Sequence, residues 1–198
     1  MVHPWETVYK QNKFKITTLK PSIVIESNKH LFSQGNTVFD IGCGNGRNSI
    51  FLANKGCIVD AIDVADLKWL EQIPEKVRKN IHFQKQDVTH FKWVYSFYDA
   101  VILTRIIQYI DIKSLDDLIR NIFESLTKKG ILLISYNKSG GIHTKEEINV
   151  PKFVHDLKII ETLLSKFFKE VQISKGSSTS VHVGYTGPIE SYDIICFK

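Results

Sequence analysis

Three glycines separated by single residues follow an acidic residue in the stretch TVFDIGCGNGRNS, residues 37–49. Glycine lets a backbone approach a ligand closely and adopt positive φ angles, so such a turn behind an apolar run is typical of a ligand-binding loop. A phosphate-binding loop requires a lysine after its last glycine, whereas Arg47 follows Gly46 here. The spacing therefore excludes a phosphate loop.

The same spacing argues against a dinucleotide. The fingerprint Gly-x-Gly-x-x-Gly would need its third glycine at Arg47, and Asp40, two residues before the first glycine, would repel a pyrophosphate and suit a cationic ligand. S-adenosylmethionine carries an ammonium, a sulfonium, a ribose and an adenine but no phosphate. The turn therefore favours S-adenosylmethionine over NAD. The alternative is a turn that only joins a strand to a helix.

Two further acids stand where the other parts of this ligand would lie. Asp63 ends an apolar strand about 20 residues after the first glycine, where a carboxylate can accept both ribose hydroxyls. Asp60 competes for this role, but strand alternation places it in the middle of the strand. Asp87 ends the next strand, where its carboxylate can accept the adenine amino group while Val88 packs on the ring.

Strands and helices that alternate along the chain must position these residues. Apolar runs predict strands at 37–41, 57–63, 81–87, 98–104, 131–136, 170–174 and 191–197. Helical spacing predicts helices at 22–32, 47–55, 66–73, 114–129 and 153–168. The last two strands have no helical pattern between them, so we expect them to pair antiparallel at one edge. The pattern predicts an α/β fold with a mostly parallel, doubly wound sheet.

The helix predicted at 114–129 carries the clearest end signals. Ser114 with Asp117 three residues later resembles a capping box at its start. Lys128, Lys129 and the following Gly130 form a cationic, glycine-closed end.

Composition indicates an ordinary globular protein. The chain has 198 residues, of which 43% are hydrophobic and 24% are charged, so we expect one domain over 1–198. We find neither a signal peptide nor about 18 consecutive apolar residues, which predicts a cytoplasmic protein without a membrane partner. The net charge of +5 comes from scattered lysines, which favours a solvated basic surface over a nucleic-acid partner.

The cysteines indicate neither a disulfide nor a metal site. Cys43, Cys57 and Cys196 are an odd set without C-x-x-C spacing, and each lies in an apolar run. We therefore expect buried thiols and no bound metal.

The order of VFDIGCGNG, VDAID, QDV, YDAVILT and KKGILLISY, over residues 37–136, resembles the class I S-adenosylmethionine-dependent methyltransferases. Within it, DIGCGNGRNSIFLANKG followed by VDAID is similar to the tellurite-resistance type of small methyltransferase. The resemblance implies a Rossmann-like, seven-stranded sheet of order 3-2-1-4-5-7-6 whose last strand is antiparallel. It also implies S-adenosylmethionine as cofactor and S-adenosylhomocysteine as product.

The resemblance assigns roles to matched positions. Asp40 would steer the methionine ammonium through the turn, Gly42 and Gly44 would line the methionine and ribose, and Leu103 with Thr104 would lie beside the sulfonium. The full predicted cofactor-binding set is Asp40, Gly42, Cys43, Gly44, Asp63, Val64, Asp87, Val88, Leu103 and Thr104.

Motifs say less about the residues that bind or activate the methyl acceptor. We predict a helical cap or lid over 1–35 and a substrate-side loop over 137–152. The candidates for catalysis are Tyr9, Arg105 and His143. Trp5 and Tyr9 lie one helical turn apart and either fold over the cofactor or anchor the N-terminal segment. Further candidates in the last strand connection are His182 and Tyr185.

We expect a small-molecule acceptor, such as an oxyanion or a thiol. The N-P-P-Y tetrad and the Pro-Cys nucleophile of nucleic-acid methyltransferases are missing from the sequence; TRII follows the fourth strand instead. The alternatives are an RNA or protein methyltransferase and a protein that binds S-adenosylmethionine without catalysis. The sequence gives no indication of the oligomeric state.

Overall fold

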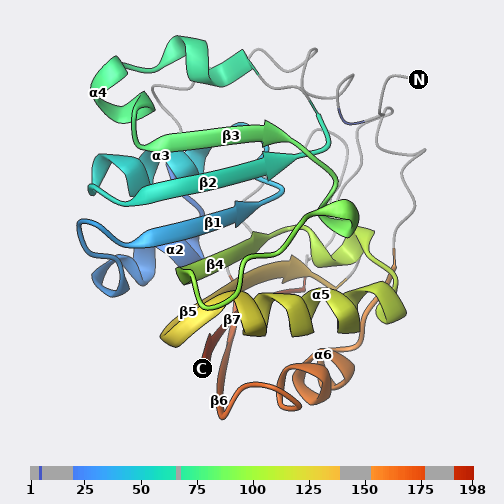
Figure 1. Ribbon diagram of the computed structural model, residues 1–198. Coiled ribbons are helices and arrows are strands. Elements are labelled where there is room, and N and C mark those ends of the chain that lie inside the picture. The colour runs from blue at the N-terminus through green and yellow to red at the C-terminus, as the bar shows by residue number, and fades with distance from the viewer. Residues whose placement is uncertain (1–4, 6–19, 66–67, 139–152, 177–189) are drawn as a thin grey trace.

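The computed structural model describes Trp5 and residues 20–65, 68–138, 153–176 and 190–198. A seven-stranded sheet has the order β3-β2-β1-β4-β5-β7-β6 (Figure 1). Its strands are β1 (Thr37–Ile41), β2 (Ile58–Asp63), β3 (Ile81–Lys85), β4 (Tyr98–Thr104), β5 (Leu126–Asn137), β6 (Glu170–Lys175) and β7 (Ser191–Phe197). Neighbouring strands from β3 to β5 are parallel, and β7 is antiparallel to both β5 and β6. The predicted order and the antiparallel last pair are confirmed.

Helices cover both faces of the sheet. Figure 1 shows α5 and α6 in front of it and α2 and α3 behind it. The helices are α2 (Ile23–Ser27), α3 (Arg47–Asn54), α4 (Glu75–Arg78), α5 (Ile112–Ser125) and α6 (Leu157–Leu164). Short 3-10 turns are η2 (Lys29–Leu31), η3 (Lys68–Gln72), η4 (Val88–His90) and η5 (Ile107–Tyr109). The prediction of a doubly wound α/β fold is confirmed.

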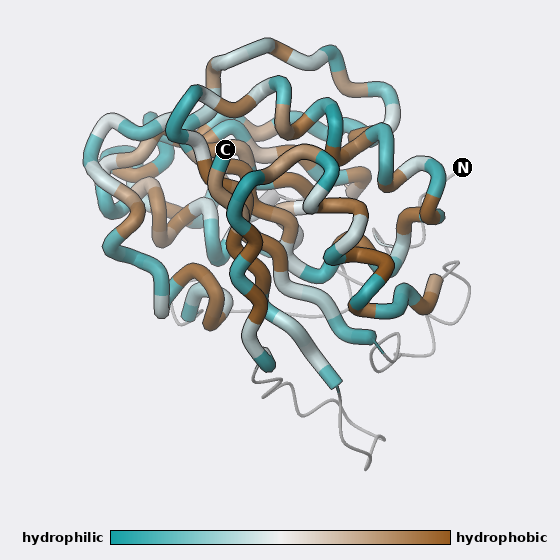
Figure 2. The backbone as a smooth tube through the Cα atoms, turned by 90° about the horizontal axis from the view of Figure 1, so that it is seen from below, coloured by the Kyte–Doolittle hydropathy of each residue, from teal (hydrophilic) through white to brown (hydrophobic). Residues whose placement is uncertain are grey.

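Alternation along the strands divides the core into two clusters, one on each face. Phe39 and Ile41 of β1 pack into the front cluster with α5, whereas Val38 packs into the rear cluster with Leu52 of α3. Figure 2 shows the hydrophobic residues concentrated along the central strands. Because successive side chains point to opposite faces, Asp40 points toward α3, on the rear face. This orientation brings an acid of β1 to the helix that follows the glycine turn.

The start of α5 differs from the prediction. Asp111 caps the helix, because its Oδ1 accepts hydrogen bonds from the backbone amides of Lys113 and Ser114, both at 3.1 Å. The predicted capping box of Ser114 and Asp117 is therefore wrong by one turn. An acid placed directly before the first helical residue satisfies two of the amides that a helix leaves unpaired.

The end of α5 differs as well. The helix stops at Ser125, not at Lys129, because Leu126 is fully buried and already begins β5. The cation at this helix end comes from far along the chain: the Nζ of Lys198 donates to the carbonyl oxygen of Phe123 at 2.5 Å. Lys198, which is far from α5 in the sequence, thus supplies the favourable positive charge that we predicted for Lys128 and Lys129.

Other element boundaries shift by a few residues. The helix predicted at 153–168 begins only at Leu157, after Asp156 caps it by accepting from the backbone amide of Lys158 at 2.8 Å. Strand β3 ends at Lys85, so Asp87 lies two residues past the strand.

The first predicted helix is interrupted. It splits into α2 and η2 at Asn28, whose side chain donates to the carbonyl oxygen of Val24. The helix predicted at 66–73 is the 3-10 turn η3 where the structure describes it.

Most of the predicted lid over 1–35 and of the predicted loop over 137–152 lies outside the described residues. No helix among the residues that the structure describes is long and apolar enough to cross a membrane.

Candidate functional site

The glycine turn lies at the carboxyl end of β1 and leads directly into α3. Gly42, Gly44 and Gly46 all have positive φ angles, of +67°, +54° and +72°. The backbone amides of Gly42 and Cys43 donate to the carbonyl oxygen of Ile62 in β2 at 2.8 and 3.0 Å. A Cβ atom at position 42 would overlap Cδ1 of Ile106, the second residue after β4. The turn thus has a tightly defined path between the ends of β2 and β4.

Asp63 lies directly against this turn. Its Oδ2 accepts a hydrogen bond from the amide of Gly44 at 2.9 Å, and its Oδ1 accepts one from the amide of Ala65 at 2.9 Å. Asp60 is used elsewhere, because it accepts from the hydroxyl of Tyr98 at 2.8 Å in the middle of the sheet. Of the two acids considered for the ribose, the structure brings Asp63 to the turn.

Asp40 is fully buried behind the turn. Its Oδ2 accepts a hydrogen bond from the hydroxyl of Ser49 at 2.5 Å, whereas Oδ1 has no partner in the described part of the chain. Burial raises the pKa of Asp40 to about 7; the hydrogen bond from Ser49 opposes this rise, and the charge of Asp63 adds to it. A buried carboxylate with one unpaired oxygen is well suited to a cationic partner.

Asp87 and Val88 follow β3 at the same edge of the sheet. Asp87 is exposed, and its Oδ1 accepts from the backbone amide and the hydroxyl of Thr89 at 2.9 and 2.7 Å. Val88 is partly buried and lines a pocket of about 160 Å³, together with Trp93 and Ile110. The pocket beside the predicted adenine acid is thus lined partly by apolar and partly by polar side chains.

The end of β4 is tied to both rear helices. Leu103 is fully buried in the front core, and the hydroxyl of Thr104 accepts a hydrogen bond from Nδ2 of Asn48 in α3 at 3.0 Å. Oδ1 of the same asparagine accepts from the backbone amide of Ser22 at 2.8 Å. Asn48 is itself buried, so its amide holds three separate segments together at this edge.

Arg105 turns the chain immediately after β4. It has a φ of +60°, unusual for a residue with a side chain, and its backbone amide donates to the carbonyl oxygen of Ser135 at 2.6 Å. Burial raises the pKa of Asp193, and the hydrogen bond from Ser135 and the charge of Arg105 oppose this rise. The structure therefore brings the predicted arginine beside an acid of β7.

Trp5 contacts the 3-10 turn η5 that follows β4. The ring of Trp5 meets that of Tyr109 edge to face, with centroids 5.2 Å apart. Trp5 also packs against the rear core. Four further candidates lie outside the described residues, namely Tyr9, His143, His182 and Tyr185.

Unpaired polar atoms gather at this edge. Among the described residues, the buried side-chain atoms without a hydrogen-bond partner are Ser22 Oγ, Asp40 Oδ1, Trp69 Nε1, Gln108 Oε1 and Tyr136 OH. Asp40 and Tyr136 stand at strand ends, and Gln108 is in η5, directly after β4. Trp69 packs against Gly46, and Ser22 lies beside Asn48. Since buried polar atoms are normally paired, each of these atoms calls for an explanation.

Comparison with known proteins identifies the family. Residues 3–171 match the family described as Tellurite resistance protein TehB. The chain belongs to this TehB family. Because the match covers most of the chain, it includes the turn, the three acids and the end of β4.

One curated relative of this TehB-family protein is described as a methyltransferase. The chain is 31% identical over 127 residues to the ribosomal protein L11 methyltransferase of Campylobacter concisus (strain 13826), an alignment that covers 64% of this chain and 42% of that relative. The chain thus spans less than half the length of that relative.

Two solved structures share the fold. A putative S-adenosylmethionine-dependent methyltransferase from Listeria monocytogenes has a TM-score of 0.69 at 17% identity, covering 88% of this chain and 97% of that one. The 1,6-didemethyltoxoflavin-N1-methyltransferase of Burkholderia thailandensis, with S-adenosylhomocysteine bound, has a TM-score of 0.69 at 14% identity, covering 97% and 84%. The predicted Rossmann-like fold is confirmed, and the match to the TehB family confirms the predicted resemblance to the tellurite-resistance type of protein.

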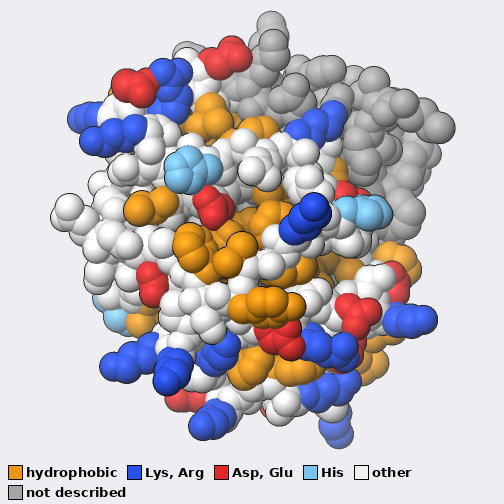
Figure 3. Space-filling model, in the orientation of Figure 1, with side chains coloured by type: hydrophobic (Ala, Val, Ile, Leu, Met, Phe, Trp, Pro, Cys, Tyr) orange, Lys and Arg blue, Asp and Glu red, His pale blue; other side chains and the backbone are white. Residues whose placement is uncertain are grey.

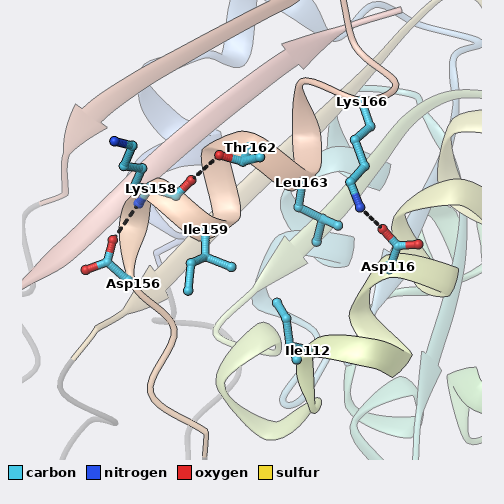
Figure 4. Close-up of a pocket in the computed structure, with 8 residues that line it drawn as sticks. All are labelled: Ile112, Asp116, Asp156, Lys158, Ile159, Thr162, Leu163 and Lys166. Atoms are coloured by element: carbon cyan, nitrogen blue, oxygen red, sulfur yellow. Dashed lines mark hydrogen bonds and ion pairs between the residues drawn. The ribbon is translucent and has the colours of Figure 1, made fainter.

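A second groove of this TehB-family protein, larger than the pocket beside Val88, lies away from the predicted residues. It has a volume of about 520 Å³ and runs between α5 and α6, over the apolar side chains of Ile112, Ile159 and Leu163 (Figure 4). Lys166 closes one end through an ion pair with Asp116 at 2.7 Å. No predicted site residue lines this groove.

The surface of the front face is mixed in charge. Figure 3 shows Lys and Arg side chains at the upper left and along the lower rim, interspersed with Asp and Glu. Within the described ranges we find no cluster of His, Cys, Asp or Glu able to hold a metal ion.

Sequence reasoning missed several residues of this edge, among them Asn48, Ser49, Gln108 and Tyr136. One signal was present for Gln108, since it is an amide inside the otherwise apolar and aromatic run 106–110. For Asn48 and Ser49 the signal was position, because both lie in the first turn of the helix that follows the glycines.

Proposed function

We propose that this TehB-family protein binds S-adenosylmethionine at the glycine turn and transfers its methyl group to a small molecule. The observation that carries the proposal is the unpaired, fully buried Oδ1 of Asp40 directly behind the turn. A carboxylate there matches a ligand with a cationic ammonium group and would repel a pyrophosphate. The residues present therefore fit this cofactor.

Each part of the cofactor has a residue to hold it. Asp40 would attract the methionine ammonium, and Gly42 with Gly44 would let the methionine and ribose approach the backbone. Asp63, already fixed by two backbone amides, would accept the ribose hydroxyls. Asp87 would accept the adenine amino group, with Val88 against the ring. In the full proposed set, Cys43, Val64, Leu103 and Thr104 complete the lining.

Little further chemistry is required of the protein. The bound cofactor supplies a methyl group already activated by its positive sulfur, for an in-line displacement. The chain contributes by positioning the acceptor and excluding water. A general base is needed for an alcohol or a protonated amine, and not for an acceptor that is already an anion. Arg105 is our candidate for an anionic group of the acceptor, since it directly follows β4.

A small acceptor is supported by one structural neighbour, whose description names 1,6-didemethyltoxoflavin as its bound substrate. An oxyanion or a thiol remains the prediction of the family resemblance. The second candidate is methylation of a protein, because the Campylobacter concisus relative is described as a ribosomal protein methyltransferase. The alternative of binding without catalysis predicts cofactor affinity and no turnover.

Calorimetric titration with S-adenosylhomocysteine, beside NAD, tests the proposal. We expect micromolar or tighter binding of the homocysteine compound and none of NAD. Binding of NAD, or of neither, would overturn the cofactor assignment. Transfer of labelled methyl groups to a pool of small metabolites and, separately, to purified ribosomal protein L11 then decides between the two acceptor classes. Affinity without transfer to either would support the non-catalytic alternative.

A further inference from the structure

The side-chain amide oxygen of Gln108 is buried and unpaired. This residue of η5 is only 3% exposed, and no group in the described residues bonds its Oε1. Its backbone carbonyl oxygen, in contrast, accepts a hydrogen bond from the amide of Phe153 at 2.8 Å. A buried carbonyl oxygen without a hydrogen-bond donor is unfavourable for folding. The side chain of Gln108 therefore does not stabilise the fold through this oxygen, and its presence needs another explanation.

The turn that carries Gln108 is held from several sides. Nε2 of His155 lies 3.1 Å from the carbonyl oxygen of Ile107 and 2.9 Å from that of Ile110, so it donates to this turn. Trp5 packs its ring edge to face with Tyr109 of the same turn. Because Trp5 and His155, which are far apart in the sequence, both contact η5, the backbone that presents Gln108 is held in place.

A second unpaired group stands on the neighbouring strand. Tyr136 is one residue before the end of β5 and only 1% exposed, and its hydroxyl has no hydrogen-bond partner among the described residues. Thr104 at the end of β4 pairs with Ser135 of β5. Tyr136 directly follows Ser135, and Gln108 lies in the 3-10 turn that follows β4, so both belong to the carboxyl ends of neighbouring parallel strands. In open α/β sheets, ligands bind outside such carboxyl ends.

We infer that Gln108 and Tyr136 bind the methyl acceptor, and that this acceptor carries an O–H or N–H group beside the atom that is methylated. The inference rests on the proposed methyltransferase function. The amide oxygen of Gln108 only accepts hydrogen bonds, whereas the phenol of Tyr136 donates or accepts. A thiolate or a fully deprotonated oxyanion offers only lone pairs, and would leave Oε1 unpaired. The two residues therefore select small alcohols, phenols, amines or azoles.

The first experiment measures stability. Gln108→Met replaces the amide by an apolar side chain of similar length, and Tyr136→Phe removes only the hydroxyl. We expect both variants to melt at or above the temperature of the wild type, because each loses an unpaired buried polar group. The matched control is Asn48→Leu, which removes a buried amide that is bonded on both sides and should lower the melting temperature. A comparable loss in Gln108→Met would show a structural partner and overturn the inference.

The second experiment measures acceptor choice as release of S-adenosylhomocysteine. The probes are catechol and imidazole, which carry donors, and thiophenol and sodium tellurite at a pH where both are deprotonated. We expect turnover of a donor-bearing probe, and an increase of about tenfold in its KM in Gln108→Met with a smaller change in kcat. Turnover of thiophenol or tellurite alone, of no probe, or an unchanged KM would overturn the inference.

Calorimetry separates this inference from the function on which it rests. Gln108→Met should bind S-adenosylhomocysteine within about twofold of the wild type, since its amide faces the acceptor and not the cofactor. If the wild type itself fails to bind that compound, the proposed function falls. If it binds and the variants behave otherwise than expected, only the acceptor assignment falls.

Discussion

The carboxylate of Asp63 accepts a hydrogen bond from the backbone amide of Gly44 at 2.9 Å, and this bond joins the end of β2 to the turn that follows β1. The acid predicted to hold the ribose therefore also shapes the glycine turn. Its other oxygen is fixed by the amide of Ala65, so the carboxylate is oriented by the fold itself. Acid and turn form one preorganised unit, which a ligand would not have to assemble.

Removing this carboxylate should affect binding and stability together. In Asp63→Ala we expect the affinity for S-adenosylhomocysteine to fall at least about tenfold, because charge-assisted bonds to hydroxyls are lost along with the shape of the turn. The two amides left without their acceptor should lower the free energy of unfolding by about 1–3 kcal/mol. Calorimetry and urea unfolding measure the two effects.

Asp99→Ala is the matched control for that variant. Asp99 stands at the opposite, amino end of the sheet, where its Oδ2 accepts from the backbone amide of Thr37 at 2.9 Å and from Nδ2 of Asn36 at 3.3 Å. We expect a loss of stability of the same order and unchanged affinity for the ligand. An equal loss of affinity in both variants would mean that general destabilisation, and not the ribose contact, explains Asp63→Ala.

The buried acid of β1 predicts a pH-dependent stability. Burial raises the pKa of Asp40 from 3.8 to about 7, so between these values the folded state holds a proton that the unfolded state releases. The contribution of this group to stability is complete below about pH 4 and is lost as the pH rises through about 7. The side chain of Asn does not titrate, so the stability of Asp40→Asn should not show this loss. Urea unfolding should therefore show the variant gaining on the wild type from about pH 4 to about pH 7.

The same titration predicts a pH-dependent affinity. The carboxylate form of Asp40 attracts an ammonium group, so wild-type affinity for S-adenosylhomocysteine should rise through about pH 7 and that of Asp40→Asn should stay flat. Ser49→Ala removes the hydrogen bond that lowers the pKa of Asp40, and should move the midpoint to higher pH. A flat profile in the wild type would contradict a role of Asp40 in ligand binding.

The fold was largely predictable because its signals are local. Strands such as β1 and β4 are mostly apolar, and α5 has a clear helical period. The ends of α5 were predicted wrongly because helix caps depend on residues that lie outside the repeating apolar pattern. Asp111 competes with Ser114 for the first turn, and Lys198 reaches the last turn from the end of the chain. The position of β7 between β5 and β6 came from the family resemblance.

Some residues of the candidate site were likewise predictable from the sequence, and others were not. The glycine turn and Asp63 were predictable because their spacing along the chain fixes their places at the strand ends. Gln108 and Tyr136 were not, because a lack of partners is a property of three-dimensional packing. A glutamine in an apolar run shows that something unusual is buried, but only the fold shows that no described group pairs with it.

The three cysteines should be unreactive in the folded protein. All are buried, and burial raises the pKa of Cys43 well above its ordinary value and that of Cys196 to about 12. Because the thiolate is the reactive form, Ellman's reagent should modify these thiols only as fast as the chain opens. In denaturant three thiols per chain should react at once. Fast labelling of native protein, assigned to Cys43 by mass spectrometry, would contradict a closed turn.

Gly35 and Gly42 both have positive φ angles, but only Gly42 has a side chain packed against it. Comparing the two therefore separates the cost of a strained backbone from the cost of a steric overlap. Gly35 has a φ of +86°, and a Cβ atom added there would have no neighbour within 4 Å. At Gly42, with φ +67°, the added atom would overlap the side chain of Ile106. Gly35→Ala should therefore lose only the backbone cost of about 1–2 kcal/mol in urea unfolding. Gly42→Ala should lose more, because the side chain of Ile106 must also move.

A double-mutant cycle with Ile106→Ala isolates the steric part. If Ile106 covers the turn, Gly42→Ala should cost less in the Ile106→Ala background than in the wild type, and approach the loss in Gly35→Ala. Equal losses in both backgrounds would show that Ile106 does not cover the turn in solution. Gly42→Ala should also weaken binding of S-adenosylhomocysteine, while Gly35→Ala should not, because only position 42 lies where the methionine and ribose are proposed to approach the backbone.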